Sequence, residues 1–323
     1  MQLRPLGRSG LHTAPLAMGG NAFGWTADEK ASYAVLDAFV AAGFSLIDTA
    51  DVYSKWVQGN VGGESETIIG YWLKSRGQRD RVLIATKVAG EIEPGRKGLS
   101  SAHIKRAVDD SLRRLQTDYI DLYQAHYSDD QVSFEETLGA FADLIAAGKV
   151  RAIGVSNHSA DQLAQAIAVS EASGLPRYET LQPLYNLYDR QEFEEEYAPL
   201  CRAEGIGVIS FYALASGFLS GKYRSEADIK ASKRQRSNSR YLNPRGFRIL
   251  SALDAVAAKT GARQAQVAIA WLLAQPDVTA PIASATSVQQ VEELAAAVRL
   301  TLDVESLMLL NDASAYGEAE AAQ

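Results

Sequence analysis

The chain is poor in cysteine and contains no long apolar run. Cys201 is the only cysteine among 323 residues, so no disulfide can form within the chain. It lies in a helical pattern over residues 198–203 without a metal-binding or nucleophilic neighbour, and we expect an inert helix residue. No apolar run approaches the roughly 20 residues that a membrane span needs, and residues 1–7 lack the apolar centre of a signal peptide. The sequence therefore predicts a cytoplasmic protein with no membrane partner.

An excess of positive charge is also absent. The chain carries 32 lysines and arginines against 39 aspartates and glutamates, a formal net charge of −7. Nucleic acid therefore has no global electrostatic support as a partner. The hydrophobic fraction of 47% and the charged fraction of 22% are typical of a globular protein with a sizeable core. We expect a monomer or a weak homo-oligomer, with a disordered Ala/Glu-rich tail over residues 317–323.

Short apolar runs alternate with helical patterns from one end of the chain to the other. The predicted strands cover residues 16–19, 45–48, 82–87, 119–126, 150–156, 180–183, 207–211 and 278–282. The predicted helices cover residues 28–42, 64–75, 100–115, 134–147, 160–173, 192–204, 245–260 with 264–274, and 288–297. Glycines follow several of these helices, and Ser100 and Thr26 are candidate N-caps.

Eight strand–helix units with no linker between them predict one closed (β/α)₈ TIM barrel, a single domain over residues 1–323. Two doubly wound domains are the alternative, but an open nucleotide-binding sheet needs a Gly-x-Gly-x-x-Gly turn after its first strand. Residues 18–24, Met-Gly-Gly-Asn-Ala-Phe-Gly, lack that spacing. Before the first strand, Gly7 and Gly10 indicate a β-hairpin that closes the bottom of the barrel.

Polar side chains end three of the predicted strands. Asp48, Lys87 and His126 end the second, third and fourth strands, and Tyr53 lies on the loop after Asp48. Residues at the carboxyl ends of barrel strands point into one site, so we expect these side chains to converge. Each alone has an ordinary structural explanation, such as a helix cap, a snorkelling lysine or a core histidine. Their joint occurrence at strand ends favours catalysis.

These residue types suit the reduction of a carbonyl group, in which hydride reaches carbon and a proton reaches oxygen. A tyrosine, with an ordinary pKa of about 10, donates a proton near neutrality if a nearby cation lowers that pKa. Lys87 is a candidate for this cation, and Asp48 would keep it charged. His126 could donate a hydrogen bond to the substrate oxygen or join the proton relay. The sequence thus predicts that Lys87 tunes Tyr53, and that Tyr53 and His126 face the carbonyl.

The longest predicted loop, residues 220–243, is locally basic. The cations in it and just beyond it are Lys222, Arg224, Lys230, Lys233, Arg234, Arg236, Arg240, Arg245 and Arg248. Barrels often bind phosphate with the loops after their seventh and eighth strands. We expect most of these charges to be solvated and one or two of them to hold phosphate.

Five segments together resemble the aldo-keto reductase superfamily, in the form of the general bacterial enzymes. They are residues 44–53 (FSLIDTADVY), 63–70 (GESETIIG), 84–87 (IATK), 118–126 (DYIDLYQAH) and 148–157 (GKVRAIGVSN). The resemblance extends over nearly the whole chain and implies a (β/α)₈ barrel that binds NADP(H) without a Rossmann domain. It also implies reversible NAD(P)H-dependent reduction of an aldehyde or ketone, a small-molecule substrate. The catalytic tetrad that it implies is Asp48, Tyr53, Lys87 and His126.

The resemblance also implies contacts to the cofactor. Ser156, Asn157 and Gln182 match positions that hold the nicotinamide carboxamide, whose donor and acceptor suit hydroxyl and amide groups. Phe211 falls where an aromatic ring stacks on the nicotinamide. The positions that match a loop covering the pyrophosphate are Leu214, Ser216, Gly217 and Lys222.

The motif for the adenosine phosphate matches more loosely, at Ser284, Thr286, Gln290 and Glu293. Glu293 matches an adenine-binding acid. Ser284 and Gln290 bring no charge to a 2′-phosphate, whereas Arg240 or a neighbour could add one. We therefore expect NADP as the cofactor, with NAD as the open alternative.

Aromatic residues on loops after strands are candidates for the substrate pocket. Trp25, Trp56 and Tyr127 suit a ring-bearing or otherwise apolar carbonyl compound, although the two tryptophans could instead pack their loops together. Two other functional classes stay open. One is a cofactor-binding regulatory subunit of the same fold without significant turnover, and the other is an isomerase or lyase that needs no nicotinamide.

Overall fold

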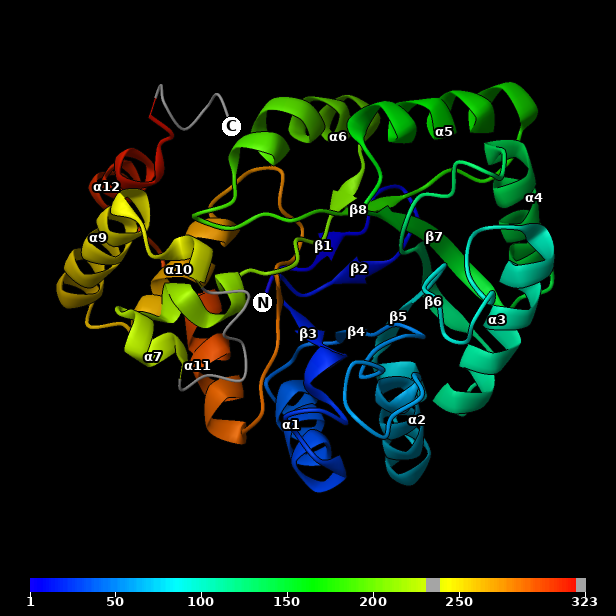
Figure 1. Ribbon diagram of the computed structural model, residues 1–323, viewed down its shortest axis with the longest axis horizontal. Helices are drawn as coiled ribbons and strands as arrows, with labels where there is room; N and C mark the ends of the chain where they lie inside the picture. The colour runs from blue at the N-terminus through cyan, green and yellow to red at the C-terminus, as the bar shows by residue number, and fades with distance from the viewer. Residues whose placement is uncertain (231–238, 318–323) are drawn as a thin grey trace.

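The computed structural model describes residues 1–230 and 239–317. Three cations of the predicted basic loop, Lys233, Arg234 and Arg236, lie outside these residues, as does the predicted tail from residue 318 onward. In the described part, the chain forms a ring of strands with helices around it (Figure 1).

Eight parallel strands form one sheet in the described part of the chain, in the order β10-β3-β4-β5-β6-β7-β8-β9. They are β3 (Ala17–Gly19), β4 (Leu46–Asp48), β5 (Leu83–Val88), β6 (Ile120–Ala125), β7 (Val150–Ser156), β8 (Thr180–Gln182), β9 (Gly207–Val208) and β10 (Ile282–Ala283). The first and last strands of this order are also joined. The carbonyls of Val208 and Ser210 accept hydrogen bonds from the amides of Thr279 (2.9 Å) and Ile282 (2.8 Å), respectively. The sheet therefore closes, and the predicted (β/α)₈ barrel is confirmed.

Helices surround the barrel (Figure 1). They are α1 (Glu29–Ala41), α2 (Glu64–Arg76), α3 (Ser101–Leu115), α4 (Phe134–Ala146), α5 (Ala160–Ser173), α6 (Ala198–Glu204), α7 (Glu226–Lys230), α9 (Pro244–Thr260), α10 (Gln264–Leu273), α11 (Val288–Arg299) and α12 (Val304–Ser314). Short helical turns are η1 (Gly20–Ala22), η2 (Arg79–Arg81), η3 (Phe193–Tyr197), η4 (Ala215–Ser220) and η5 (Ser239–Tyr241). Across residues 1–230 and 239–317, none of the helices combines the length and apolar character that a bilayer crossing requires.

Three helices differ from the predictions, and one of them is α7, which lies within the predicted loop over residues 220–243. The predicted helix over residues 192–204 is the π-helical turn η3 followed by α6. The helix α12 has no counterpart among the predicted elements. Its apolar residues Val304 and Met308 are 72% and 59% exposed, and such exposure obscures the amphipathic pattern by which a surface helix is recognised.

Side chains that accept hydrogen bonds determine where helices begin. Ser100 caps α3, as predicted, because its hydroxyl oxygen accepts a hydrogen bond from the His103 amide (3.4 Å). The prediction that Thr26 caps α1 is wrong. Asp28 is the N-cap, and its Oδ1 accepts a hydrogen bond from the Ala31 amide at 2.8 Å. Its negative charge also interacts favourably with the N-terminal end of the helix dipole.

The N-terminal hairpin covers one end of the barrel, as predicted. The strands β1 (Arg4–Pro5) and β2 (His12–Thr13) pair antiparallel. Leu6 and Leu11 beside them are buried with the residues that fill the barrel interior. Gly7 has a φ of 63°, and a Cβ there would lie 2.0 Å from a backbone carbonyl oxygen, so only glycine fits. The opposite end of the barrel, at the carboxyl ends of the strands, carries the polar residues.

The two faces of each strand have different roles because successive side chains point to opposite sides. Leu46, Ala85 and Leu122 belong to the buried cluster inside the barrel. Asp48 and Lys87 follow two residues later on β4 and β5, so they share this inward face. The alternation that buries the interior also directs the polar residues into the top of the barrel.

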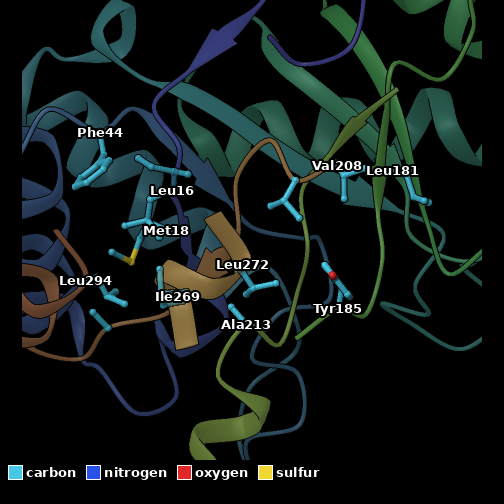
Figure 2. Packing of buried hydrophobic residues seen from close by; sticks show 14 of the residues in the cluster. Leu16, Met18, Phe44, Leu181, Tyr185, Val208, Ala213, Ile269, Leu272 and Leu294 are labelled. Carbon is cyan, nitrogen blue, oxygen red and sulfur yellow. The ribbon is translucent and has the colours of Figure 1, made fainter. Parts of the chain in front are cut away.

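Outward-facing apolar side chains fill the layer between the sheet and the helices. One buried cluster joins the strand β3 to two helices (Figure 2). It contains Leu16, just before β3, Met18 on β3, Ile269 and Leu272 on α10, and Leu294 on α11. Burial of each such side chain contributes about 1.5–3 kcal/mol. This layer fixes α10 and α11 against the barrel, with their N-terminal ends next to the cavity described below.

Candidate active site

Lys87 is the centre of a buried hydrogen-bond cluster at the carboxyl ends of β4 and β5. Its ammonium group donates to Asp48 Oδ2 (2.8 Å), to the Thr49 carbonyl (2.8 Å) and to Tyr53 Oη (2.9 Å). These three acceptors match the three N–H bonds of an ammonium group. The Lys87 side chain is 0% exposed, so the Asp48 carboxylate supplies the counter-charge that a buried cation needs.

Strand register explains how these residues meet. Asp48 pairs with Ala85 across β4 and β5, and Lys87 lies two residues beyond Ala85 on the same face. The chain then turns after β4, and the Tyr53 amide donates a hydrogen bond to the Ala50 carbonyl (3.2 Å). This turn returns the tyrosine ring to the end of its own strand.

Burial dominates the electrostatics of this cluster. It raises the pKa of Tyr53 well above 10, and the nearby Asp48 carboxylate raises that pKa further. Burial also lowers the pKa of Lys87 below its usual value, although Asp48 opposes this effect. The expectation that Lys87 lowers the pKa of Tyr53 is therefore wrong for the protein without ligand. Tyr53 is a neutral phenol at physiological pH and retains its proton.

His126 joins the cluster from the end of β6. Its amide donates to the Val88 carbonyl (2.8 Å), and its own carbonyl accepts from Asn157 Nδ2 (2.8 Å), so its backbone is fixed on two sides. Its ring centroid lies 6.0 Å from that of Tyr53. Burial, followed by the charge of Lys87, holds the pKa of His126 well below 6.5. The imidazole is therefore neutral and has one N–H to donate.

A cavity of about 850 Å³ opens beside this cluster, within the range of about 300–1,000 Å³ that is typical of small-molecule sites. Three of the predicted catalytic residues, Asp48, Tyr53 and His126, line it, and Lys87 lies behind them. The predicted cofactor contacts that also line it are Ser156, Asn157, Gln182, Phe211, Leu214, Ser216, Gly217, Lys222, Ser284, Thr286, Gln290 and Glu293.

Hydrogen bonds to one another, to a backbone carbonyl and to Asp48 fix the side chains of the three residues predicted to hold the carboxamide. Ser156 Oγ donates to the Gln182 carbonyl (2.8 Å), and Asn157 Nδ2 donates to Ser156 Oγ (3.1 Å). Gln182 Nε2 donates to Asp48 Oδ1 (2.8 Å), so the trio is connected to the tetrad. This network leaves side chains of fixed orientation at the cavity wall, as specific recognition of a polar ligand requires.

The loop predicted to cover the pyrophosphate contains backbone in the left-handed region, which favours glycine. Ser216 and Gly217 have φ values of 56° and 94° within η4. A Cβ on Gly217 would lie 3.3 Å from Lys222 Nζ, so the missing side chain leaves room for the lysine beside the loop. A cation beside closely approachable backbone suits a phosphate group.

Two predicted site residues lie elsewhere. Among the described residues that line the cavity, Arg240 does not appear; its guanidinium is bound to Asp189 Oδ2 (2.9 Å) and to Tyr241 Oη (2.7 Å). Trp25 is likewise outside the described lining, and its ring packs edge-on against Trp56 at 5.7 Å. The loop-packing alternative therefore describes Trp25, while Trp56 and Tyr127 line the cavity.

The structure adds lining residues that sequence reasoning missed, among them Gly19, Asn21, Tyr212, Arg263, Gln264, Ala265 and Gln266. Gln124 is a further missed residue, and its Nε2 lies 3.4 Å from Asp48 Oδ1. Its position two residues before His126 places a polar side chain on the inward face of β6, which is a usable signal in the sequence. Arg263 also carries a signal, because arginine is an unusual residue at a helix N-cap.

Comparison with known proteins identifies relatives along the whole chain. A model described as the aldo/keto reductase family matches residues 15–315. The chain is 36% identical over 320 residues to an uncharacterized oxidoreductase, YrpG, of Bacillus subtilis, covering 97% of this chain and 95% of the relative. It is 30% identical over 329 residues to an aryl-alcohol dehydrogenase (NADP⁺) of Phanerodontia chrysosporium, covering 94% and 83%. It is also 35% identical over 302 residues to a probable voltage-gated potassium channel subunit beta of Oryza sativa, covering 91% and 90%.

A closed barrel with a buried, hydrogen-bonded Asp–Lys–Tyr cluster beside a cavity of about 850 Å³ is the architecture of a barrel oxidoreductase. The chain belongs to the aldo/keto reductase family, and the resemblance found in the sequence is confirmed. Members of this family are oxidoreductases that use nicotinamide cofactors.

Proposed function

We propose that the protein reduces an aldehyde or a ketone to the corresponding alcohol, reversibly, with NADPH. The observation that carries this proposal is the contact of Lys87 with both Asp48 and Tyr53 at the wall of the cavity. This geometry suits the delivery of one proton to an oxygen atom in the cavity, with a fixed cation placed where negative charge develops.

The cavity also suits a dinucleotide. Ser156, Asn157 and Gln182 offer neutral hydrogen-bonding groups for a carboxamide, while Gly217 and Lys222 offer a close approach and a cation for phosphate. When bound there, the reduced nicotinamide supplies the hydride that the carbonyl carbon receives. The side chains of this protein then have to manage the proton and the developing charge.

Tyr53 is the proton donor in this mechanism. Because burial keeps its pKa well above 10, its hydroxyl retains the proton until the substrate oxygen becomes basic. The proton then moves from Tyr53 Oη to that oxygen, and Lys87 Nζ, 2.9 Å away, stabilises the phenolate that remains. Asp48 Oδ2 keeps Lys87 charged through its 2.8 Å ion pair. After the alcohol leaves, the phenolate takes a proton from water, and in alcohol oxidation the hydroxyl proton of the alcohol passes to the Tyr53 phenolate.

His126 orients the substrate. Its neutral imidazole lines the cavity and can donate a hydrogen bond to the carbonyl oxygen. Beyond it, Trp56, Tyr127 and Tyr212 are 52%, 46% and 45% exposed at the cavity wall. Exposed aromatic rings beside the reacting position suit a ring-bearing or otherwise apolar carbonyl compound.

The decisive experiment follows NADPH absorbance with a panel of aryl and alkyl aldehydes and ketones, for the wild type and for Tyr53→Phe. We expect turnover of at least one compound class by the wild type and a loss of about 10²–10⁴-fold in Tyr53→Phe, because the general acid is removed. NADPH binding, measured by tryptophan fluorescence, should survive the substitution. Tyr71→Phe on the exposed surface of α2 is the matched control and should leave turnover unchanged. Turnover of wild-type magnitude in Tyr53→Phe would refute the assignment.

A second candidate function is a cofactor-binding subunit of another protein. Its support is the 35% identity to a probable voltage-gated potassium channel subunit beta over 91% of the chain. The same experiment separates the two functions. Tight NADPH binding without turnover across the whole panel would favour the subunit, whereas turnover that depends on Tyr53 favours the reductase.

A further inference from the structure

One part of the cavity, away from the tetrad, contains an ion pair between two helices. Arg263 stands immediately before α10, Glu293 lies on α11, and Arg263 Nη1 contacts Glu293 Oε1. Both residues line the cavity. The arginine side chain is 62% exposed and the glutamate side chain 25% exposed, so the guanidinium remains accessible to a ligand.

Arg263 is the N-cap residue of α10, a position at which arginine is unusual. A helix N-cap is usually Ser, Thr, Asp or Asn, whose side-chain oxygen accepts a backbone hydrogen bond, and arginine has no acceptor. Gln266 compensates locally, because its Oε1 accepts from the Arg263 amide (2.9 Å). Its Nε2 donates to the Glu293 carbonyl (3.2 Å). Gln266 thus holds the two charged residues in fixed relative positions, and helix stability does not account for the arginine.

Positive charge is scarce around this cavity. Among the described lining residues, the lysine and arginine side chains are those of Lys222 and Arg263. Lys222 lies next to Gly217 in the predicted pyrophosphate loop. The turn before α11 provides neutral side chains, and two of them have hydrogen-bond partners within the protein. Ser284 Oγ lies 2.5 Å from Asn21 Oδ1, and Gln290 Oε1 accepts from the Thr286 amide (2.8 Å).

We propose that Arg263 binds the adenosine 2′-phosphate of NADPH and thereby makes the protein prefer NADPH to NADH. This inference rests on the proposed function, in which the nicotinamide lies beside Tyr53. The adenosine then lies near Arg263, because Arg263 contacts Glu293, the residue that matches an adenine-binding acid. A guanidinium has five N–H donors in a planar fork that matches phosphate geometry, so it binds a phosphate while keeping a contact to Glu293. NADH has only a hydroxyl at this position and gains no charge-assisted contact.

The test measures equilibrium binding and requires no turnover. Dissociation constants for NADPH, NADH and the fragments 2′,5′-ADP and 5′-ADP are determined by calorimetry for the wild type and for Arg263→Ala. We expect Arg263→Ala to weaken NADPH and 2′,5′-ADP by about 10- to 100-fold, the value of a hydrogen-bonded charge contact. NADH and 5′-ADP should bind with unchanged affinity. Arg299→Ala, an exposed arginine at the C-terminal end of α11 and outside the described lining, is the matched control and should change nothing.

Further variants separate charge from fold. Arg263→Gln keeps much of the side-chain length without charge and should lose NADPH affinity as Arg263→Ala does, whereas Arg263→Lys should retain part of it. Lys222→Ala should weaken NADPH and NADH alike, because both carry a pyrophosphate. Equal effects of Arg263→Ala on the two dinucleotides, or no effect on either, would overturn the role of Arg263 and leave the reductase proposal intact. Failure of the wild type to bind any dinucleotide would overturn both.

Discussion

The side chain of Gln182, at the end of β8, donates a 2.8 Å hydrogen bond to Asp48 Oδ1, at the end of β4. These strands are not neighbours in the sheet, so the bond crosses the top of the barrel. The other oxygen of the same carboxylate, Oδ2, accepts from Lys87. Asp48 thus connects the predicted carboxamide-binding residues, through Lys87, to the predicted proton donor Tyr53. One carboxylate oxygen binds Gln182 and the other binds Lys87.

Replacement of Asp48 tests this connection. Asp48→Asn keeps the shape of the side chain but removes the counter-charge of Lys87, which is 0% exposed. We expect a loss of about 3–5 kcal/mol in the free energy of unfolding, as is typical when one partner of a buried ion pair is removed. Urea denaturation measures this loss. Asp109→Asn, which breaks the exposed pair with Lys149, should cost less than about 1 kcal/mol. Similar losses in both variants would show that the buried pair has no special role.

Replacement of Lys87 separates charge stabilisation from binding. In Lys87→Met the phenolate of Tyr53 would form without a cation 2.9 Å away. We expect kcat to fall by about 10²–10³-fold, the usual effect of removing one preorganised donor at a developing charge. The dissociation constant of NADPH should change little, because Lys87 lies behind the cavity wall. Lys105→Met on the surface of α3 is the control. A large loss of NADPH affinity with unchanged kcat would contradict the mechanism.

The position of the tetrad was accessible to sequence reasoning because it depends on local features. Strand periodicity and the residue that ends each strand determine where Asp48, Lys87 and His126 point, and barrel topology brings strand ends together. The electrostatics of Tyr53 were not accessible. The direction of its pKa shift depends on how completely the folded chain excludes water, and burial outweighs the nearby lysine.

Contacts between distant segments explain the remaining differences. Arg240 was a reasonable phosphate ligand by charge, but Asp189, 51 residues earlier, binds its guanidinium. Arg263 has a local signal as an unusual N-cap residue, but its place at the cavity depends on α11, where its partner Glu293 lies 30 residues away. Both outcomes depend on which elements pack together in three dimensions, and hydrophobic periodicity within a single segment does not contain that information.

The buried carboxyl of Asp51 makes stability depend on pH. Burial raises its pKa from 3.8 to about 8, and the neighbouring Glu66 adds to the effect. The folded protein therefore binds a proton that the unfolded chain releases between these two values. In this interval stability falls as pH rises, by up to about 1.4 kcal/mol per pH unit for one group.

Asp51→Asn removes this titration. Its stability relative to the wild type should therefore increase steadily as the pH rises from about 5 to about 8, the interval that follows from the raised pKa of Asp51. Urea denaturation of both proteins at several pH values measures the difference. Asp303→Asn is a useful comparison, because Lys259 and Ser306 lower the pKa of that exposed residue. A constant difference between wild type and Asp51→Asn across this pH range would show that Asp51 is ionised in the folded protein.

Gly217 tests the predicted pyrophosphate loop independently of the adenosine 2′-phosphate. Gly217→Ala places a Cβ 3.1 Å from Lys222 Cε at a φ of 94°, so it strains the backbone and displaces the lysine. We expect NADPH and NADH to bind about tenfold more weakly, a loss of about 1.4 kcal/mol, because the displaced Lys222 no longer lies beside the loop. Gly174→Ala, at a φ of 66° with no atom within 4 Å of the new Cβ, controls for backbone strain alone and should lower stability without affecting binding. Because both dinucleotides carry the pyrophosphate, a loss confined to NADPH would assign this loop to the 2′-phosphate instead.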